Sequence, residues 1–177
     1  MILELAQRCT ARLKDWLGPF CERIEVAGSI RRCRGVVGDI DLVVIPKIHE
    51  RHDLFGQPEA RDNLTAMEIQ RRCTAEGWRV DKAGEDYISF VTSGSAGKEP
   101  VQVDIWFAAP ETFGTVWLCR TGSASHNITL SQRAQALGGH WQPHKGVTIR
   151  GRRHAASTEA EVFAALNLPF VNPEDRH

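Results

Sequence analysis

Apolar side chains recur along the chain with two different periods, and these periods predict both helices and strands. In residues 2–17 an apolar side chain returns every three or four positions, which is the spacing of one buried helical face. In residues 101–107 apolar and polar side chains alternate, as in a strand with one face in the core. Helices are predicted over residues 2–17, 63–76, 110–119, 125–137 and 159–166. Strands are predicted over residues 23–27, 39–45, 78–82, 87–92 and 101–107, with a hairpin over 141–149.

Two stretches show neither period. Residues 47–62 combine Gly, Pro and charges of both signs, so we expect a loop there, in which His49 and His52 do not complete a metal site. Residues 93–97 contain only Ser, Gly and Ala and predict a flexible hairpin loop.

Two carboxylates interrupt an otherwise apolar strand. Asp39 and Asp41 are two positions apart, so both should point to the same face of the strand over 39–45. Two ionised carboxylates roughly 4 Å apart repel by about 4 kcal/mol at an effective dielectric near 20, and a strand of Val and Ile has no structural reason to bear that repulsion. A divalent cation supplies one, because Mg²⁺ is typically bound by one or two carboxylates together with substrate phosphates. Asp104 lies on the polar face of the strand over 101–107, and it completes an acidic cluster if the two strands pair.

Gly28-Ser29, directly before a short helical stretch, predicts a site for a phosphate. Backbone N–H groups at a helix N-terminus and a serine hydroxyl can bind an anion, and Arg32 can add a charge-assisted contact. A Gly-Ser turn alone is a weak signal, and the two acidic strands make it specific. The combination predicts a nucleotide whose phosphates share the metal.

The composition limits the classes of protein to which the chain can belong. Its 177 residues, 42% of them hydrophobic, suffice for one compact domain or two small lobes. Lys and Arg together number 22, as do Asp and Glu, so contacts to nucleic acid must come from a local basic patch. No apolar run approaches the roughly 20 residues of a membrane span. Five cysteines without CxxC spacing favour a reducing compartment over a disulfide or zinc framework.

Four segments resemble DNA polymerase family X, the polymerase β group of nucleotidyltransferases, in that family's order. They are AGSIRRCRGVVGDIDLVVIP, VQVDIWFAAPETFG, RTGSASHNITL and TEAEVFAALNLPFVNPEDR. The resemblance implies an α+β fold: a nucleotidyltransferase palm over residues 1–118, with a mixed β-sheet and flanking helices, and a small α+β thumb over 119–177. It begins at the palm, so we expect neither a lyase domain nor a helix-hairpin-helix, as in small viral and bacterial members.

The resemblance also implies roles for individual residues. Asp39 and Asp41 would bind both of two Mg²⁺ ions, for which Mn²⁺ can substitute, and Asp104 would bind the catalytic ion. The nucleotide would be bound by Gly28, Ser29, Arg32, Gly38, Thr121, Gly122, Ser123 and Asn127, with a cis peptide between Gly122 and Ser123. The basic patch that would contact the template backbone consists of Lys145, Arg150, Arg152 and Arg153, although a solvated hairpin tip is an alternative explanation of these four residues.

The chain departs from the family at three positions. Cys119 and Arg120 stand where the polymerases usually have two aromatic residues, so ribonucleotides could be accepted and Arg120 could contact a phosphate or the primer. Trp106 stands where the family often has Arg, which changes the support of the carboxylates, although simple packing would also explain this Trp.

We therefore expect an enzyme that adds nucleotides to a 3′-hydroxyl, a DNA-directed DNA polymerase of the family X type acting in gap filling or DNA repair. Its partners would be a nucleoside triphosphate and primer-template or gapped DNA, without a membrane, and we expect a cytoplasmic monomer of bacterial or viral type. Three alternatives remain open. The acceptor could be an RNA end, a small molecule or a protein; transfer could be template-independent; or the chain could be a non-catalytic nucleic-acid-binding module, against which the three aspartates argue.

Overall fold

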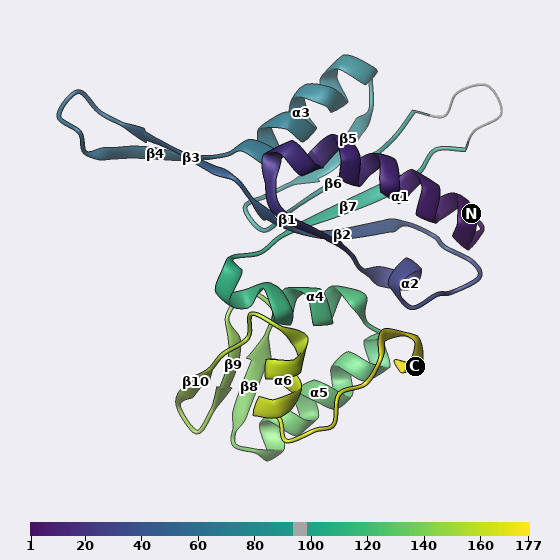
Figure 1. Ribbon diagram of the computed structural model, residues 1–177, viewed down its shortest axis with the longest axis vertical. Coiled ribbons are helices and arrows are strands. Elements are labelled where there is room, and N and C mark those ends of the chain that lie inside the picture. The colour runs from purple at the N-terminus through teal and green to yellow at the C-terminus, as the bar shows by residue number, and fades with distance from the viewer. Residues whose placement is uncertain (94–98) are drawn as a thin grey trace.

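A five-stranded mixed sheet with helices on both faces forms the first part of the structure (Figure 1). The computed structural model describes residues 1–93 and 99–177, so the loop predicted at 93–97 lies almost wholly outside the described residues. The strands, in spatial order, are β1 (Cys21–Val26), β2 (Ile40–Pro46), β7 (Gln102–Phe107), β6 (Tyr87–Val91) and β5 (Arg79–Ala83). β2 and β7 are parallel, and the other neighbours are antiparallel.

Helices α1 (Leu3–Leu17) and α3 (Leu64–Glu76) cover one face of this sheet. Asn63 caps α3 by accepting a hydrogen bond from the backbone N–H of Ala66 at 2.9 Å, and Gly77 ends it in the left-handed conformation with φ of +64°. Residues of both helices share one apolar core with inward side chains of the central strands. That core includes Ala6, Leu13, Leu17, Ile40, Leu42, Val44, Ile69, Cys73, Val103 and Ile105.

The second part of the chain builds a smaller antiparallel sheet flanked by helices. Its sheet has the order β10 (Arg152–His154), β9 (Gly146–Ile149) and β8 (Gly139–Gln142). The helices are α4 (Phe113–Thr121), α5 (Ala124–Ala136) and α6 (Glu159–Ala165), and the capping box of Thr158 and Glu161 is present at the start of α6. A separate apolar core includes Leu118, Leu130, Ala134, Trp141, Val147, Val162, Phe163 and Leu166. The predicted α+β class with a mixed sheet is confirmed.

Helix α4 connects the two parts. Phe113 and Val116 pack with Val43 on the face of the large sheet opposite α1, whereas Leu118 belongs to the second core. The helix continues across residue 118, and the division into a palm over 1–118 and a thumb over 119–177 stays a prediction.

The prediction of a loop over residues 47–62 was wrong. β3 (Ile48–His52) and β4 (Pro58–Asn63) form a two-stranded antiparallel ribbon that extends away from the large sheet (Figure 1). β3 is exposed along its whole length, so neither of its faces needs apolar side chains and no alternation marks it. β10, within the basic patch, was missed for the same reason. No helix in the described part of the chain has the length and hydropathy needed to cross a membrane.

Candidate active site

Strands β2 and β7 place two carboxylates side by side. Asp41 and Asp104 are register partners in the parallel pairing, and the next partners, Leu42 and Ile105, are fully buried in the core. Asp39 lies just before β2, near enough for its charge to act on Asp41. The structure thus brings together the three aspartates that the sequence singled out.

The surroundings of Asp41 strongly raise the pKa of its carboxyl group. Burial, followed by the charge of Asp39, raises the pKa of Asp41 to about 7, and the charge of Asp104 acts in the same direction. A hydrogen bond from Trp106 and the charge of Arg120 oppose this rise. Without a cation, Asp41 therefore bears only part of its negative charge at neutral pH, and a bound divalent cation would favour the ionised form.

The turn before α2 (Gly28–Arg31) is held against Asp41. The backbone N–H of Ala27 donates to the carbonyl of Asp41 at 2.9 Å. Gly28 has φ of +58°, and a Cβ at this position would overlap Oδ2 of Asp41, so glycine is required on both counts. The hydroxyl oxygen of Ser29 is buried and has no hydrogen-bond partner within the described residues. An unpartnered buried hydroxyl at this turn suits a ligand with acceptor oxygens, such as a phosphate.

Arg32 connects this turn with the segment Thr121-Gly122-Ser123. Its Nη1 donates to the carbonyl oxygen of Thr121, and its Nε is buried without a partner in the described part of the chain. The peptide between Gly122 and Ser123 is cis, as the resemblance implies, and Ser123 caps α5. These residues from distant segments therefore meet, whereas a Cβ at Gly38 would have open space around it and the role of Gly38 stays a prediction.

The remaining predicted residues lie further along the second part. Nδ2 of Asn127 donates to the carbonyl of Cys119 at 2.8 Å, while its Oδ1 is buried without a partner in the described structure. The four residues of the basic patch, Lys145, Arg150, Arg152 and Arg153, are all exposed. Their sheet contacts the N-terminal half of α4 through Thr115 and Pro143, whereas Arg32 contacts its C-terminal end.

Two side-chain interactions near these residues were not predicted from the sequence. Trp106 donates its indole N–H to Oδ1 of Asp41 at 3.2 Å; its departure from the family pattern was visible, but the hydrogen bond was not. Glu159 on α6 accepts two hydrogen bonds from Arg31 of α2, at 2.6 and 2.7 Å, and two from Arg176, at 2.8 and 3.1 Å. Arg31 and Glu159 are 128 positions apart, so no local sequence pattern predicts this contact.

The residues present suit a divalent cation in part. Within residues 1–93 and 99–177, no three His, Cys, Asp or Glu side chains are grouped so that they alone could hold a metal. The donors beside the turn are carboxylate oxygens, which Mg²⁺ prefers, and Mg²⁺ commonly takes its other ligands from water and substrate phosphates. The chemistry of these carboxylates therefore suits a divalent cation, whereas their arrangement in the described residues does not by itself form a complete metal site.

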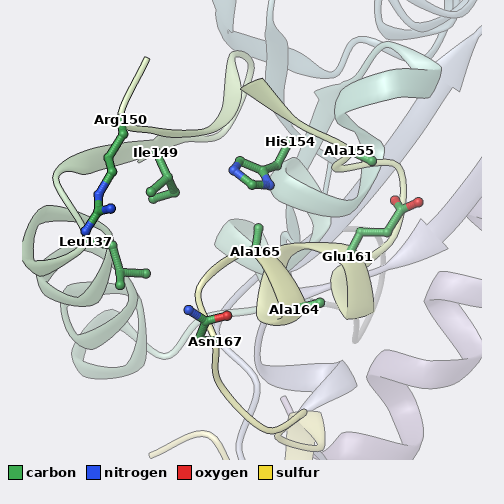
Figure 2. Close-up of a pocket in the computed structure, with 9 residues that line it drawn as sticks. All are labelled: Leu137, Ile149, Arg150, His154, Ala155, Glu161, Ala164, Ala165 and Asn167. Carbon is green, nitrogen blue, oxygen red and sulfur yellow. The ribbon is translucent and has the colours of Figure 1, made fainter. Parts of the chain in front are cut away.

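A cavity of about 560 Å³ lies elsewhere, between β9, β10 and α6 (Figure 2). It is lined by Leu137, Ile149, Arg150, His154, Ala155, Glu161, Ala164, Ala165 and Asn167. None of the three aspartates lines this cavity, so it is distinct from the acidic cluster. Arg150 is the one predicted site residue in its lining.

Comparison with known proteins supports the same relationship. Residues 116–177 match the family described as DNA polymerase beta thumb. Over 174 residues the chain is 26% identical to DNA polymerase/3'-5' exonuclease PolX of Bacillus subtilis (strain 168). That match covers 97% of this chain and 27% of the curated relative, so the chain spans about a quarter of the relative's length. The matching thumb region, the PolX similarity and the mixed sheet carrying the acidic strands together support a relationship of this chain to the family X polymerases.

Proposed function

We propose that the chain catalyses metal-dependent transfer of a nucleotide to a 3′-hydroxyl, as a small DNA polymerase that fills gaps in DNA. The observation that carries this proposal is the pairing of Asp41 with Asp104 on neighbouring parallel strands, directly against the Gly28-Ser29 turn. This arrangement supports the proposal, because carboxylate oxygens are suited to a cation and the N–H groups and hydroxyl of the adjacent turn are suited to a phosphate.

In the proposed reaction, the 3′-oxygen forms a bond to the α-phosphorus while the bond to the bridging oxygen breaks and pyrophosphate leaves. Two Mg²⁺ ions, or Mn²⁺ in their place, would lower the pKa of the attacking hydroxyl and neutralise the triphosphate. Asp39, Asp41 and Asp104 would hold them, and Asp104 would also accept the hydroxyl proton. The Ser29 hydroxyl and the Arg32 guanidinium would donate to the β- and γ-phosphates, where negative charge grows.

The acceptor is the less constrained part of the proposal. The exposed basic patch, defined above, suits the backbone of a template strand. Arg120 occupies an aromatic position of the family, and its guanidinium lies 3.4 Å from the centroid of the Trp106 ring. This difference favours acceptors other than DNA as the second candidate, so the test must compare acceptors.

Asp104→Ala should fold normally and lose activity, since it removes the ligand and proton acceptor without touching the core. The assay supplies Mg²⁺, a one-nucleotide-gapped duplex and each deoxynucleotide singly, followed by ribonucleotides and a single-stranded primer. Templated gap filling requires that only the complementary nucleotide is added, and chelation of the metal should stop it. Asp15→Ala, which removes an exposed carboxylate on α1, is the matched control. More than a few per cent of activity in Asp104→Ala would overturn the proposal.

The same assay separates the alternatives. Indiscriminate addition to the single strand would indicate terminal transfer, and no addition to any DNA would indicate a different acceptor.

A further inference from the structure

Trp106 is enclosed between an aromatic ring and a guanidinium. The ring centroids of Tyr87 and Trp106 are 4.3 Å apart with an interplanar angle of 11°, which is a stacked pair. The Arg120 guanidinium carbon lies 3.4 Å from the centroid of the same Trp106 ring. Two groups this close to one centroid cannot share a face of the ring, so Tyr87 and Arg120 occupy opposite faces. β6, β7 and α4 each contribute one layer, and the stack fixes the plane of the indole.

The edge of the fixed indole is directed at a carboxylate. Nε1 of Trp106 donates to Oδ1 of Asp41 at 3.2 Å, from a neighbouring strand. The other oxygen, Oδ2, lies against Gly28, where no Cβ could be accommodated. One oxygen therefore accepts a hydrogen bond from a fixed donor, and the other lies close to the backbone of the turn, which limits the space in which the carboxylate can rotate.

An indole N–H suits this position because of its chemistry. It is only a donor and cannot lose its proton near neutral pH, so it cannot compete with the carboxylate for a cation. It occupies one lone pair of Oδ1 and leaves the other lone pairs of both oxygens available to a metal.

We propose that Trp106 is a positioning residue that holds the Asp41 carboxylate in the orientation needed to bind a divalent cation, with Tyr87 and Arg120 fixing the indole. This inference rests on the proposed function, in which Asp41 is a metal ligand. Partners that orient a ligating side chain typically contribute about 10–100-fold to metal affinity or activity.

The test uses Trp106→Phe, which keeps an aromatic ring between Tyr87 and Arg120 but removes the N–H. The matched control is Trp16→Phe, because Trp16 also donates its indole N–H to a carboxylate, that of Glu68 at 2.9 Å, remote from the acidic cluster. Mn²⁺ is titrated into each protein, and the free ion is measured by electron paramagnetic resonance. Thermal melting is recorded in parallel to separate loss of orientation from loss of folding.

We expect Trp106→Phe to bind Mn²⁺ about 10-fold more weakly than the native chain, with melting close to native, while Trp16→Phe binds Mn²⁺ as the native chain does. Equal affinity of Trp106→Phe and the native chain would overturn the inference and leave the proposed function intact. A weaker affinity accompanied by an equal loss in Trp16→Phe would also overturn it, since the loss would then be a general effect of destabilisation. Absence of saturable Mn²⁺ binding by the native chain both alone and with a non-hydrolysable nucleoside triphosphate, after the binding by the triphosphate itself is subtracted, would overturn the proposed function itself.

Discussion

At Gly28 the backbone leaves room for one oxygen of Asp41 and for no side chain. Gly28→Ala would force the new methyl against Oδ2 and would place an alanine at φ of +58°. A displacement of a catalytic group by about 1 Å can cost about 10²-fold in rate, so we expect turnover to fall by at least that factor. Single-nucleotide insertion kinetics measure the loss.

Gly77→Ala separates the two effects of that substitution. Gly77 has φ of +64°, but nothing lies within 4 Å of its Cβ position. It should therefore show only the backbone strain of the left-handed conformation, about 1–2 kcal/mol of stability, with turnover preserved. If Gly28→Ala retained native turnover, the close approach to Asp41 would have no functional consequence.

Some features of the acidic cluster can be predicted from the sequence and others cannot. The alternation around Asp104 already put this residue opposite the core, and Val103 and Ile105 are indeed buried. Trp106 and Asp41, by contrast, are 65 positions apart, and their hydrogen bond depends on the register of β2 against β7. No local pattern contains that register, because it is set by packing of the whole sheet.

Helices α2 and α6 are tied together by a buried carboxylate between two arginines. Glu159 is 4% exposed and Arg176 is fully buried, so the ionic contacts are shielded from water. Burial alone would raise the pKa of Glu159, but the hydrogen bonds and charges of Arg31 and Arg176 together lower it below its usual 4.5. The short helix after the Gly28-Ser29 turn is therefore anchored to α6 by ionic hydrogen bonds.

Glu159→Gln should destabilise the fold by about 3–5 kcal/mol, because it leaves two arginines without a counter-charge in a buried site. Urea denaturation at neutral pH measures this change. The exposed Glu4 pairs with Arg8 on the surface of α1, and Glu4→Gln should stay within about 0.5 kcal/mol of the native chain. A similarly small effect of Glu159→Gln would contradict the buried anchor.

The same anchor predicts a dependence on pH. Because the folded-state pKa of Glu159 is lowered, its stabilisation is present above the unfolded value near 4.5 and is lost as pH falls below it. Glu68, whose pKa is lowered to about 2, mainly by its hydrogen bond with Arg71, contributes in the same direction. The difference between the native chain and Glu159→Gln should therefore shrink from pH 7 towards acid pH, as followed by melting temperature. A difference that stayed constant would exclude ionised Glu159 as the source.

Predictable elements are those with local signals. Asn63 and Gly77 delimit α3, and Thr158 with Glu161 starts α6, as their residue types indicate. The ribbon of β3 and β4 has no such signal, because its strands pair with each other and bury little. Its backbone hydrogen bonds, rather than any apolar face, define it as a strand pair.

For the molecule as a whole, net charge gives no attraction to DNA, because 22 basic residues balance 22 acidic ones. Any such attraction must come from a local cluster of basic residues, and the basic patch is the cluster that the proposal uses. β10 is an edge strand of the small sheet. Because successive side chains of a strand point to opposite faces, Arg152 and Arg153 lie on opposite faces of the sheet at this edge. This placement suits a phosphate backbone running along the edge, but charged residues also protect an edge strand from pairing with another chain.

Salt dependence decides between these two roles. If the four basic residues each neutralise one phosphate, log K for gapped duplex should fall with log salt at a slope of about −3.6, and Arg152→Gln/Arg153→Gln should reduce it to about −1.8. Fluorescence anisotropy of a labelled gapped duplex between low and physiological salt measures both slopes. Arg8→Gln/Arg12→Gln removes the same charge from the exposed side of α1 and should leave the slope near that of the native chain. Equal slopes for the two double variants would mean that the arginines of β10 protect the sheet edge and that the duplex binds elsewhere.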